Sequence, residues 1–208
     1  ITEARQFTDP RVGEAMKYID RADFTSKSPY EDSPQGIGWN ATITAPHMHA
    51  AALERLHDKL IEGSRVLDVG SGSGYLTAAM AIMVGPTGKV NGIEHIPELV
   101  ELSRKNIAKH HSHLLSSGRV TIIEGDGRFG YPIQGGYHAI HVGAAAPSLP
   151  VELIKQLADG GRMVVPVGGN RNQEFIQIDR EGEKYRQKTL HGVIYVPLTS
   201  KHEQLNRF

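Results

Sequence analysis

Val66-Leu67-Asp68-Val69-Gly70-Ser71-Gly72-Ser73-Gly74 is the stretch of this chain that decides its fold. Its apolar residues predict a buried strand that leads into a glycine-rich turn, and the residues from Tyr75 to Val84 predict a helix directly after it. The glycines at 70, 72 and 74 allow the backbone to approach a ligand at the carboxyl edge of a sheet. The dinucleotide fingerprint G-x-G-x-x-G would need its third glycine at 75 instead. The stretch therefore favours a nucleotide-type site, although a glycine-rich loop alone is weak evidence.

Acidic residues at two neighbouring strand ends extend this prediction. Glu94 follows the predicted strand Lys89 to Ile93 and lies 20 residues after Gly74, where a carboxylate can accept hydrogen bonds from both hydroxyls of a ribose. Asp126 follows the predicted strand 119–123 and could accept from an adenine amino group. These residues would share one sheet edge and could converge on one adenosine. The alternative is that Asp68 and Asp126 only stabilise turns and that Glu94 is a solvated strand end.

The rest of the chain continues the alternation of apolar strands and amphipathic helices. Helices are expected at 10–20, 44–60, 97–110 and 150–158, strands at 138–142 and 162–167, a loop-rich stretch at 26–40, and a hairpin of 175–179 with 184–196. This order predicts a single-domain α/β fold of Rossmann-like type, with a mostly parallel central sheet, helices on both faces and an antiparallel C-terminal hairpin. Residues 1–62 would form an N-terminal helical and loop region packed on the sheet, and residues 63–208 the sheet core.

Composition restricts the partners. The 208 residues include 23 lysines and arginines, 23 aspartates and glutamates, and no cysteine. Because the charges balance, the chain has no excess of positive charge to attract nucleic acid or an anionic membrane, so neither partner is expected. The lack of cysteine excludes disulfide scaffolds and thiol nucleophiles and fits a reducing compartment. Ile1 to Arg5 show no apolar signal-peptide core, and because Ile1 is not an initiator we expect residues to be missing at this end. A cytoplasmic monomer is expected.

The acid-x-Gly-x-Gly-x-Gly pattern of Asp68 to Gly74 resembles the first motif of S-adenosylmethionine-dependent methyltransferases. Five further segments are similar to the protein-L-isoaspartate (D-aspartate) O-methyltransferase family: 41–50 (ATITAPHMHA), 125–128 (GDGR), 139–147 (AIHVGAAAP), 160–162 (GGR) and 192–199 (GVIYVPLT). The resemblance extends from about Tyr18 to Phe208. Segments 41–50 and 192–199 are specific to this family, whereas many methyltransferases share the glycine loop. The resemblance also implies exchanged last strands and a C-terminal segment over the cofactor.

The resemblance implies which residues form the site. The cofactor, S-adenosylmethionine, would be bound by Ala41, Thr42, Ile43, Thr44, His49, Asp68, Gly70, Ser71, Gly72, Ser73, Glu94, Asp126, Gly127, Thr199 and Gln204. Substrate would be bound by Ile43, Thr44 and Val196. Thr44 lies where the family has its active-site hydroxyl, often a serine, and would orient the substrate carboxylate as the catalytic residue.

The implied function is repair of damaged proteins by methylation of the α-carboxylate of L-isoaspartyl residues, with D-aspartyl residues left open as a second substrate. The methyl ester would lead through a succinimide to aspartyl. A carboxylate with a pKa near ~3.5 is already ionised at neutral pH, so the reaction needs no general base. Two alternatives remain: a methyltransferase that acts on a small-molecule carboxylate, and a cofactor-binding module without catalysis.

Eleven histidines invite a metal site, but their spacing does not support one. His47 and His49 would point in different directions from one helix. The cluster at 110–113 is expected at a solvated helix end, and His141 on an apolar strand is expected to be buried and hydrogen-bonded. The chain contains neither H-E-x-x-H nor G-x-S-x-G. We expect no metal and no covalent nucleophile.

Overall fold

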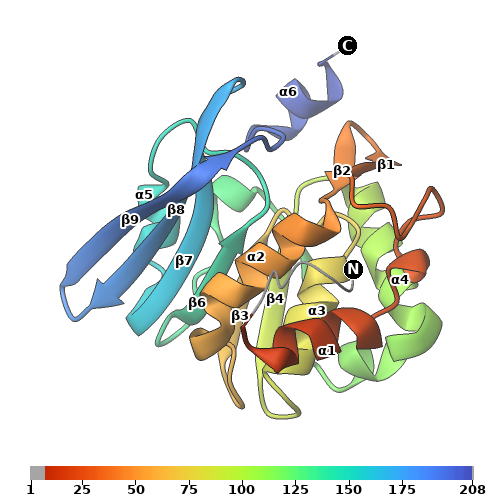
Figure 1. Ribbon diagram of the computed structural model, residues 1–208, viewed down its shortest axis with the longest axis horizontal. Coiled ribbons are helices and arrows are strands. Elements are labelled where there is room, and N and C mark those ends of the chain that lie inside the picture. Colours follow the sequence, from red (N-terminus) through yellow and green to blue (C-terminus); the bar gives the residue numbers. More distant parts are fainter. Residues whose placement is uncertain (1–7, 208) are drawn as a thin grey trace.

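The computed structural model describes residues 8–207 and is built around a seven-stranded sheet with the order β5-β4-β3-β6-β7-β8-β9 (Figure 1). Strands β3 to β7 are parallel, and β8 and β9 continue the sheet as an antiparallel hairpin. Their bounds are β3 Arg65–Val69, β4 Lys89–Glu94, β5 Val120–Glu124, β6 Tyr137–Val142, β7 Leu157–Gly169, β8 Asn172–Glu181 and β9 Lys184–Val193. The predicted fold class is therefore confirmed.

Helices cover the sheet and bury it in two apolar layers. They are α1 Pro10–Tyr18, α2 Pro46–Leu56, α3 Tyr75–Met83, α4 Pro97–Ser116, α5 Val151–Ile154 and α6 Lys201–Leu205, with 3-10 turns η1 Arg21–Asp23, η2 His57–Lys59 and η3 Gly127–Phe129. Helices α1 to α4 share one core cluster with one face of the sheet, and α5 packs in a second cluster on the other face. Successive residues of β3 alternate between the layers, since Val66 belongs to the first cluster and Leu67 to the second.

The glycine-rich turn joins β3 to α3 as the sequence predicts. Gly74 adopts φ of 86° immediately before α3, which few residues other than glycine do. A Cβ atom at Gly74 would lie 2.9 Å from the Cβ of Ser103 on α4. The third glycine of the turn therefore serves the close packing of α3 on α4, and leaves the first two to face a ligand.

The structure corrects the expected helix at 150–158. Helix α5 ends at Ile154, and β7 begins at Leu157. Tyr137 pairs with Leu157 at the start of β6, and the Tyr137 amide donates to the Gln156 carbonyl at 2.8 Å. Pairing with β6 satisfies backbone groups that a longer helix would have used, so tertiary contacts override local helix propensity here.

The histidine cluster at 110–113 is not at a helix end. Helix α4 continues to Ser116, with a kink at His111, because the side chains of His111 and Leu114 are buried against the core. The expectation of a solvated cluster was therefore wrong for His111, whereas His110 is exposed and its Nδ1 forms a hydrogen bond with Asp23 at 2.7 Å.

Two smaller differences concern strands. The loop-rich stretch 26–40 contains a short strand, β1 Gln35–Gly38, which pairs with β2 Ala41–Ile43 in a separate two-stranded sheet. Strand β9 ends at Val193, three residues before the expected end at 196. The expected helix 44–60 begins at Pro46, so Thr44 lies in the connection between β2 and α2.

The expectations about the start of the chain are not addressed by these elements. Ile1 to Arg5, where no signal-peptide core was expected, lie outside the described residues. Within residues 8–207, no helix combines the length and the apolar character needed to span a membrane.

Candidate functional site

A cleft lies at the carboxyl edge of the parallel strands, and residues 196–199, which lead to α6, form part of its lining. A water-sized molecule can reach about 60 Å³ of it, and the whole space between its lining atoms, open solvent included, is about 600 Å³. Of the residues predicted from the sequence, nine line it: Ala41, Thr42, Gly70, Gly72, Glu94, Gly127, Val196, Thr199 and Gln204. These residues come from five separate parts of the chain, so the sheet edge does bring the predicted segments together.

The glycine loop forms the floor of the cleft. Gly70 and Gly72 adopt φ of 76° and 51°, and the amides of Gly70 and Ser71 both donate to the Ile93 carbonyl, at 2.9 and 3.1 Å. A Cβ atom built on Gly70 would meet no atom within 4 Å. The backbone there is fixed to β4 and leaves room for a ligand to approach it closely.

Glu94 places a buried carboxylate beside this floor. Its side chain accepts hydrogen bonds from the amides of Gly72 and Ile96, each at 3.1 Å, and the residue is only 6% exposed. Burial raises the pKa of Glu94, an effect that the Ile96 amide and the neighbouring His95 partly offset. The backbone donors hold the carboxylate at the cleft wall, where its remaining lone pairs suit two hydroxyl donors on adjacent carbons.

Asp126 lies at the end of β5 but does not line the cleft. Its carboxylate accepts from the Arg128 amide at 3.0 Å and from Arg128 Nη2 at 2.6 Å. The side-chain hydrogen bond from Arg128 lowers the pKa of Asp126. The residue after it, Gly127, does line the cleft, and a Cβ atom there would lie 2.7 Å from Val69 Cγ1.

Asp68 is directed into the protein rather than toward the cleft. It is 1% exposed, accepts a hydrogen bond from the Thr77 hydroxyl at 2.6 Å, and accepts another from His141 Nδ1 at 2.8 Å. This pair joins β3, β6 and α3 beneath the glycine loop. The prediction that His141 is buried and hydrogen-bonded is confirmed, and the acid of the first motif acts here as the anchor of the loop.

Several other predicted residues surround the cleft without lining it. Ile43 is buried in the first core cluster. Ser73 is buried, and its hydroxyl oxygen accepts a hydrogen bond from the Tyr75 amide at 3.3 Å. Thr44 is half-buried between β2 and α2, and its hydroxyl has no hydrogen-bond partner among the described residues.

Two buried polar atoms near the glycine loop have no partner among residues 8–207: Ser71 Oγ and His49 Nδ1. The His49 ring stacks on Tyr75 with centroids 5.2 Å apart. Burial, reinforced by the charges of Arg21 and His141, lowers the pKa of His49 well below its usual range, so the ring is neutral at physiological pH. His47, two residues earlier, is exposed and contacts Asp32, which confirms that the two rings point in different directions.

The C-terminal segment closes the cleft through Gln204. His95 Nε2 donates to Gln204 Oε1 at 2.7 Å, Gln204 Nε2 donates to the Trp39 carbonyl at 2.9 Å, and the Asn40 side chain donates to the Gln204 carbonyl at 2.9 Å. Helix α6 is in turn stabilised by a capping box between Ser200 and Glu203. The segment therefore connects β4 with the β1–β2 turn across the mouth of the cleft.

Sequence reasoning missed other lining residues, notably His95, Gly143, Ala144 and Leu198. Gly143 and Ala144 follow β6 at the same carboxyl edge, so the rule that selected Glu94 also applied to them. His95 could have been noticed only as the neighbour of Glu94, because its partner Gln204 lies 109 residues away.

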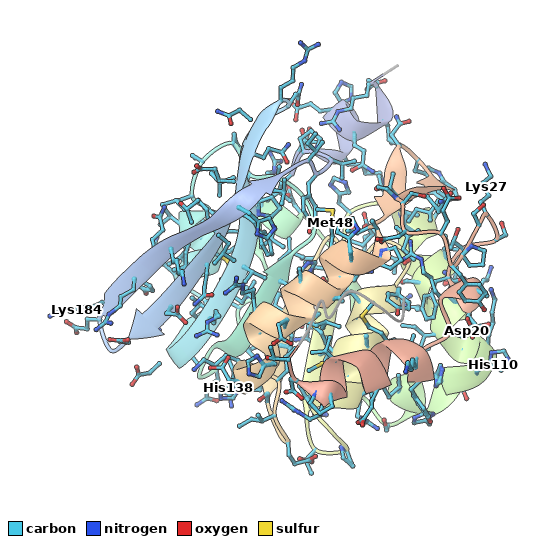
Figure 2. The ribbon with its side chains drawn as sticks, viewed as in Figure 1. Asp20, Lys27, Met48, His110, His138 and Lys184 are labelled. Atoms are coloured by element: carbon cyan, nitrogen blue, oxygen red, sulfur yellow. The ribbon has the colours of Figure 1, made fainter. Side chains whose placement is uncertain are left out.

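A second groove lies along the residues that lead into Val196 and shares no lining residue with the cleft. It is lined by residues 191–195, just before Val196, and on its opposite wall by His47, Met48 and Ala51 of α2. Figure 2 shows Met48 at the start of α2, on the side that faces the C-terminal strands. The stacked rings of Phe175 and Tyr195 lie among its lining residues.

The residues of the cleft fit a nucleoside-containing cofactor. Open space above Gly70 and a buried carboxylate on Glu94 are features that such a ligand needs. Ser71 and His49 do not line the cleft, but their unpartnered buried atoms lie beside the glycine loop. Within residues 8–207, no group of three histidine, aspartate or glutamate side chains gathers as potential metal ligands.

Comparisons with known proteins agree along nearly the whole chain. A family model described as protein-L-isoaspartate(D-aspartate) O-methyltransferase (PCMT) matches residues 1–203. The protein-L-isoaspartate O-methyltransferase of Caenorhabditis elegans is 58% identical over 204 residues, covering 98% of this chain and 91% of that protein. That of Triticum aestivum is 51% identical over 199 residues, covering 94% and 86%.

A solved structure extends the agreement to three dimensions. The protein-L-isoaspartate O-methyltransferase structure from Plasmodium falciparum, in complex with S-adenosyl-L-homocysteine, superposes with a TM-score of 0.86 at 35% identity and covers 93% of this chain and 92% of its own. The family match includes the glycine loop, Glu94 and the segment 196–199 that line the cleft. The chain therefore belongs to the protein-L-isoaspartate (D-aspartate) O-methyltransferase family.

Proposed function

We propose that this protein transfers a methyl group from S-adenosylmethionine to the α-carboxylate of L-isoaspartyl residues in damaged proteins and peptides. The observation that carries the proposal is the cleft in which Gly70 and Gly72 form an open floor beside the buried carboxylate of Glu94, in a chain of this family. When bound, S-adenosylmethionine would supply an electrophilic methyl group on a sulfonium. The relative from Plasmodium falciparum, solved with S-adenosyl-L-homocysteine, supports this choice of cofactor.

The residues of the cleft divide the binding task between them. Glu94 would accept hydrogen bonds from the two ribose hydroxyls, and Gly70 and Gly72 would allow the backbone to approach the ligand. Thr199 and Gln204, on the C-terminal segment, would cover the bound nucleoside and exclude water. Asp126 lies beside the cleft residue Gly127, and its carboxylate, which Arg128 now holds through both oxygens, would accept from the adenine amino group.

Thr44 would orient the substrate carboxylate. Its hydroxyl makes no hydrogen bond with the described residues and lies two positions after Thr42, which lines the cleft. The substrate carboxylate, with a pKa near ~3.5, is ionised at neutral pH, so no side chain has to remove a proton. What the protein must do is hold the attacking oxygen in line with the methyl group, and such positioning can supply about 7–11 kcal/mol of the barrier.

The groove along residues 191–195 favours a peptide over a small-molecule carboxylate. It is lined by residues 191–195, which lead directly into Val196 of the cleft, and a groove along such a segment suits an extended peptide chain. Ile43, the last residue of β2, is buried in the core and would support the substrate site through packing rather than direct contact. A methyltransferase for a small carboxylate would have no use for this groove.

We also propose that the protein acts as a monomer in the cytoplasm. The absence of cysteine and the balance of 23 basic and 23 acidic residues support a reducing compartment and no charged macromolecular partner. Sedimentation of the purified protein tests the first statement, and cell fractionation tests the second.

A matched pair of peptides tests the proposed reaction. The protein is incubated with excess S-adenosylmethionine and either an isoaspartyl peptide or its aspartyl isomer, and liquid chromatography follows both peptides. We expect the isoaspartyl peptide to be methylated, to release methanol as the backbone nitrogen closes a succinimide, and to accumulate as the aspartyl peptide over repeated rounds. The aspartyl isomer should be a far poorer substrate, because its free carboxylate lies one methylene farther along the side chain.

Each alternative gives a different result. Equal methylation of both isomers would indicate a general carboxyl methyltransferase. Methylation of a small carboxylate but of neither peptide would support the small-molecule alternative, and binding of S-adenosylhomocysteine without any turnover would support a cofactor-binding module.

A further inference from the structure

A separate cavity lies on the helical side of the sheet and shares no lining residue with the cleft. Its volume is about 690 Å³, which is within the range of pockets that hold small molecules. It is bounded by α1, η1, the loop at Pro29 and Tyr30, the start of α2, and Tyr75 at the start of α3. Asp20, labelled in Figure 2, lies at its border.

Arg21 is the unusual residue of this cavity. It is only 5% exposed, and Nε, Nη1 and Nη2 all lack a hydrogen-bond partner among residues 8–207. The guanidinium lies over the ring of Tyr75, 5.8 Å from its centroid. Burial lowers the pKa of Arg21, but a guanidinium keeps its charge in proteins. A buried cation whose five donors have no acceptor is costly, so the site is built for an acceptor that comes from outside the chain.

The acidic residues around Arg21 are directed to other donors. Asp20 accepts from the Ala22 amide at 3.0 Å and from the Tyr30 hydroxyl at 2.8 Å. Asp32 accepts from the amide of His47 at 3.0 Å and from its Nδ1 at 2.9 Å. Within the described part of the chain, neither carboxylate forms an ion pair with Arg21.

The other walls are mainly apolar. Met16, Pro29, Pro46 and Ala50 line the cavity together with the rings of the two tyrosines, and Lys17 adds a second positive charge at its exposed border. A guanidinium fork matches the planar geometry of a carboxylate and can bind both of its oxygens. Apolar and aromatic walls suit a hydrocarbon or aromatic body attached to that carboxylate.

We propose that this cavity is a second binding site, which takes a small monocarboxylate with a hydrophobic or aromatic body and holds its carboxylate on Arg21. Its ligand would touch two elements of the cleft region. Pro46 begins α2 directly after the Thr44-Ala45 connection, and Tyr75 follows the glycine loop and stacks on His49. The site does not depend on the proposed methyl transfer, and its test can succeed or fail independently of it.

Titration calorimetry with benzoate tests the proposal on the full chain, with the cofactor site saturated by S-adenosylhomocysteine and the substrate site by an isoaspartyl peptide, so that benzoate binds in neither. We expect one benzoate site per chain and no binding of benzamide, which has the same shape without the charge. Arg21→Gln should weaken benzoate binding by about tenfold or more, because a hydrogen-bonded charge pair is lost. Arg186→Gln, which removes an exposed arginine on β9, is the matched control and should leave benzoate binding unchanged.

Crystals of the unmodified protein soaked with 4-bromobenzoate locate the site without any variant, in case Arg21→Gln does not fold. The anomalous bromine signal should lie in the cavity, with the carboxylate on Arg21. Four results would overturn the proposal: no benzoate binding up to about 20 mM, which covers weak small-ligand binding; equal binding of benzamide; unchanged affinity in folded Arg21→Gln; or bromine at another place. If inorganic phosphate binds to the protein and benzoate does not, the cavity is a site for inorganic anions, and the proposal of a carboxylate site is also overturned.

Discussion

Replacement of Glu94 by glutamine tests the structure of the cleft most directly. The two carboxylate oxygens accept from the amides of Gly72 and Ile96, each at 3.1 Å, and face the cleft where ribose hydroxyls would bind. In Glu94→Gln an NH₂ group replaces one acceptor oxygen, and the charge is lost. A hydrogen bond to a charged acceptor contributes about 1.5–3 kcal/mol, against about 0.5–1.5 kcal/mol for a neutral one.

The expected loss of cofactor affinity is therefore about 1.5–3 kcal/mol, which corresponds to a dissociation constant about 10- to 150-fold higher. Titration calorimetry with S-adenosylhomocysteine measures it. Glu124→Gln is the matched control, since Glu124 pairs in register with Glu94 at the end of the next strand but is exposed and does not line the cleft. The control should bind like the unmodified protein.

The pH dependence of binding gives a second readout of the same group. Burial raises the pKa of Glu94 above its ordinary value of 4.5, so the carboxylate takes up a proton earlier on acidification than in the unfolded chain. Its contribution to stability is therefore present below 4.5 and is lost as pH rises through the raised pKa. Cofactor affinity changes the other way, because hydroxyl donors bind the ionised form, and should fall as pH falls through that pKa.

Glu94→Gln should lack this pH-dependent component of affinity. Thermal unfolding of the variant should show an intact fold, since a neutral amide avoids the cost of burying a charge. If the folded variant binds S-adenosylhomocysteine within about threefold of the unmodified protein, a difference of less than ~1 kcal/mol, the ribose contact assigned to Glu94 is refuted.

Three further predictions concern Thr44, Asp68 and Gln204. Thr44→Val should lower kcat for an isoaspartyl peptide while affinity for S-adenosylhomocysteine stays within a few-fold, and Thr44→Ser should remain active; a fully active valine variant would make the hydroxyl incidental. Asp68→Asn removes the charged partner of buried His141 and should cost about 1–3 kcal/mol of unfolding free energy in urea titrations, where an unchanged midpoint would contradict the anchoring role. Gln204→Ala removes the contacts with His95 and Trp39 and should speed dissociation of S-adenosylhomocysteine in stopped-flow measurements, with little change in melting temperature because Gln204 lies near the surface; an unchanged rate would show that these contacts do not hold the cleft closed.

The sequence alone predicted the features that depend on short-range rules. An apolar run followed by glycines at 70, 72 and 74 predicts a strand, a turn and a helix, and the structure has β3, that turn and α3 in these places. The acid at the end of the next strand was found by its distance along the chain, because parallel strands in such a fold end at one edge. Apolar periodicity and turn residues also predicted the C-terminal hairpin.

Local propensity failed where a tertiary partner competed with it. Residues 155–158 suit a helix, yet Leu157 pairs with β6. Helix α4 continues past His110 because the side chains of His111 and Leu114 are buried against the core. Neither partner can be seen in a window of neighbouring residues, so these element ends could not be placed from the sequence.

What the sequence determined by itself was the set of strands, turns and strand-end acids, because backbone sterics and apolar periodicity act within a few residues. Only the tertiary structure decided which of those acids faces the cleft. Asp68 and Glu94 both belong to strands at one sheet edge, but His141 and Thr77 hold Asp68 inside, whereas two backbone amides hold Glu94 at the cleft. The closure by Gln204, 109 residues from His95, and the unpaired charge of Arg21 likewise arise only when distant segments pack together, because a side chain's hydrogen-bond partners are set by neighbours in space.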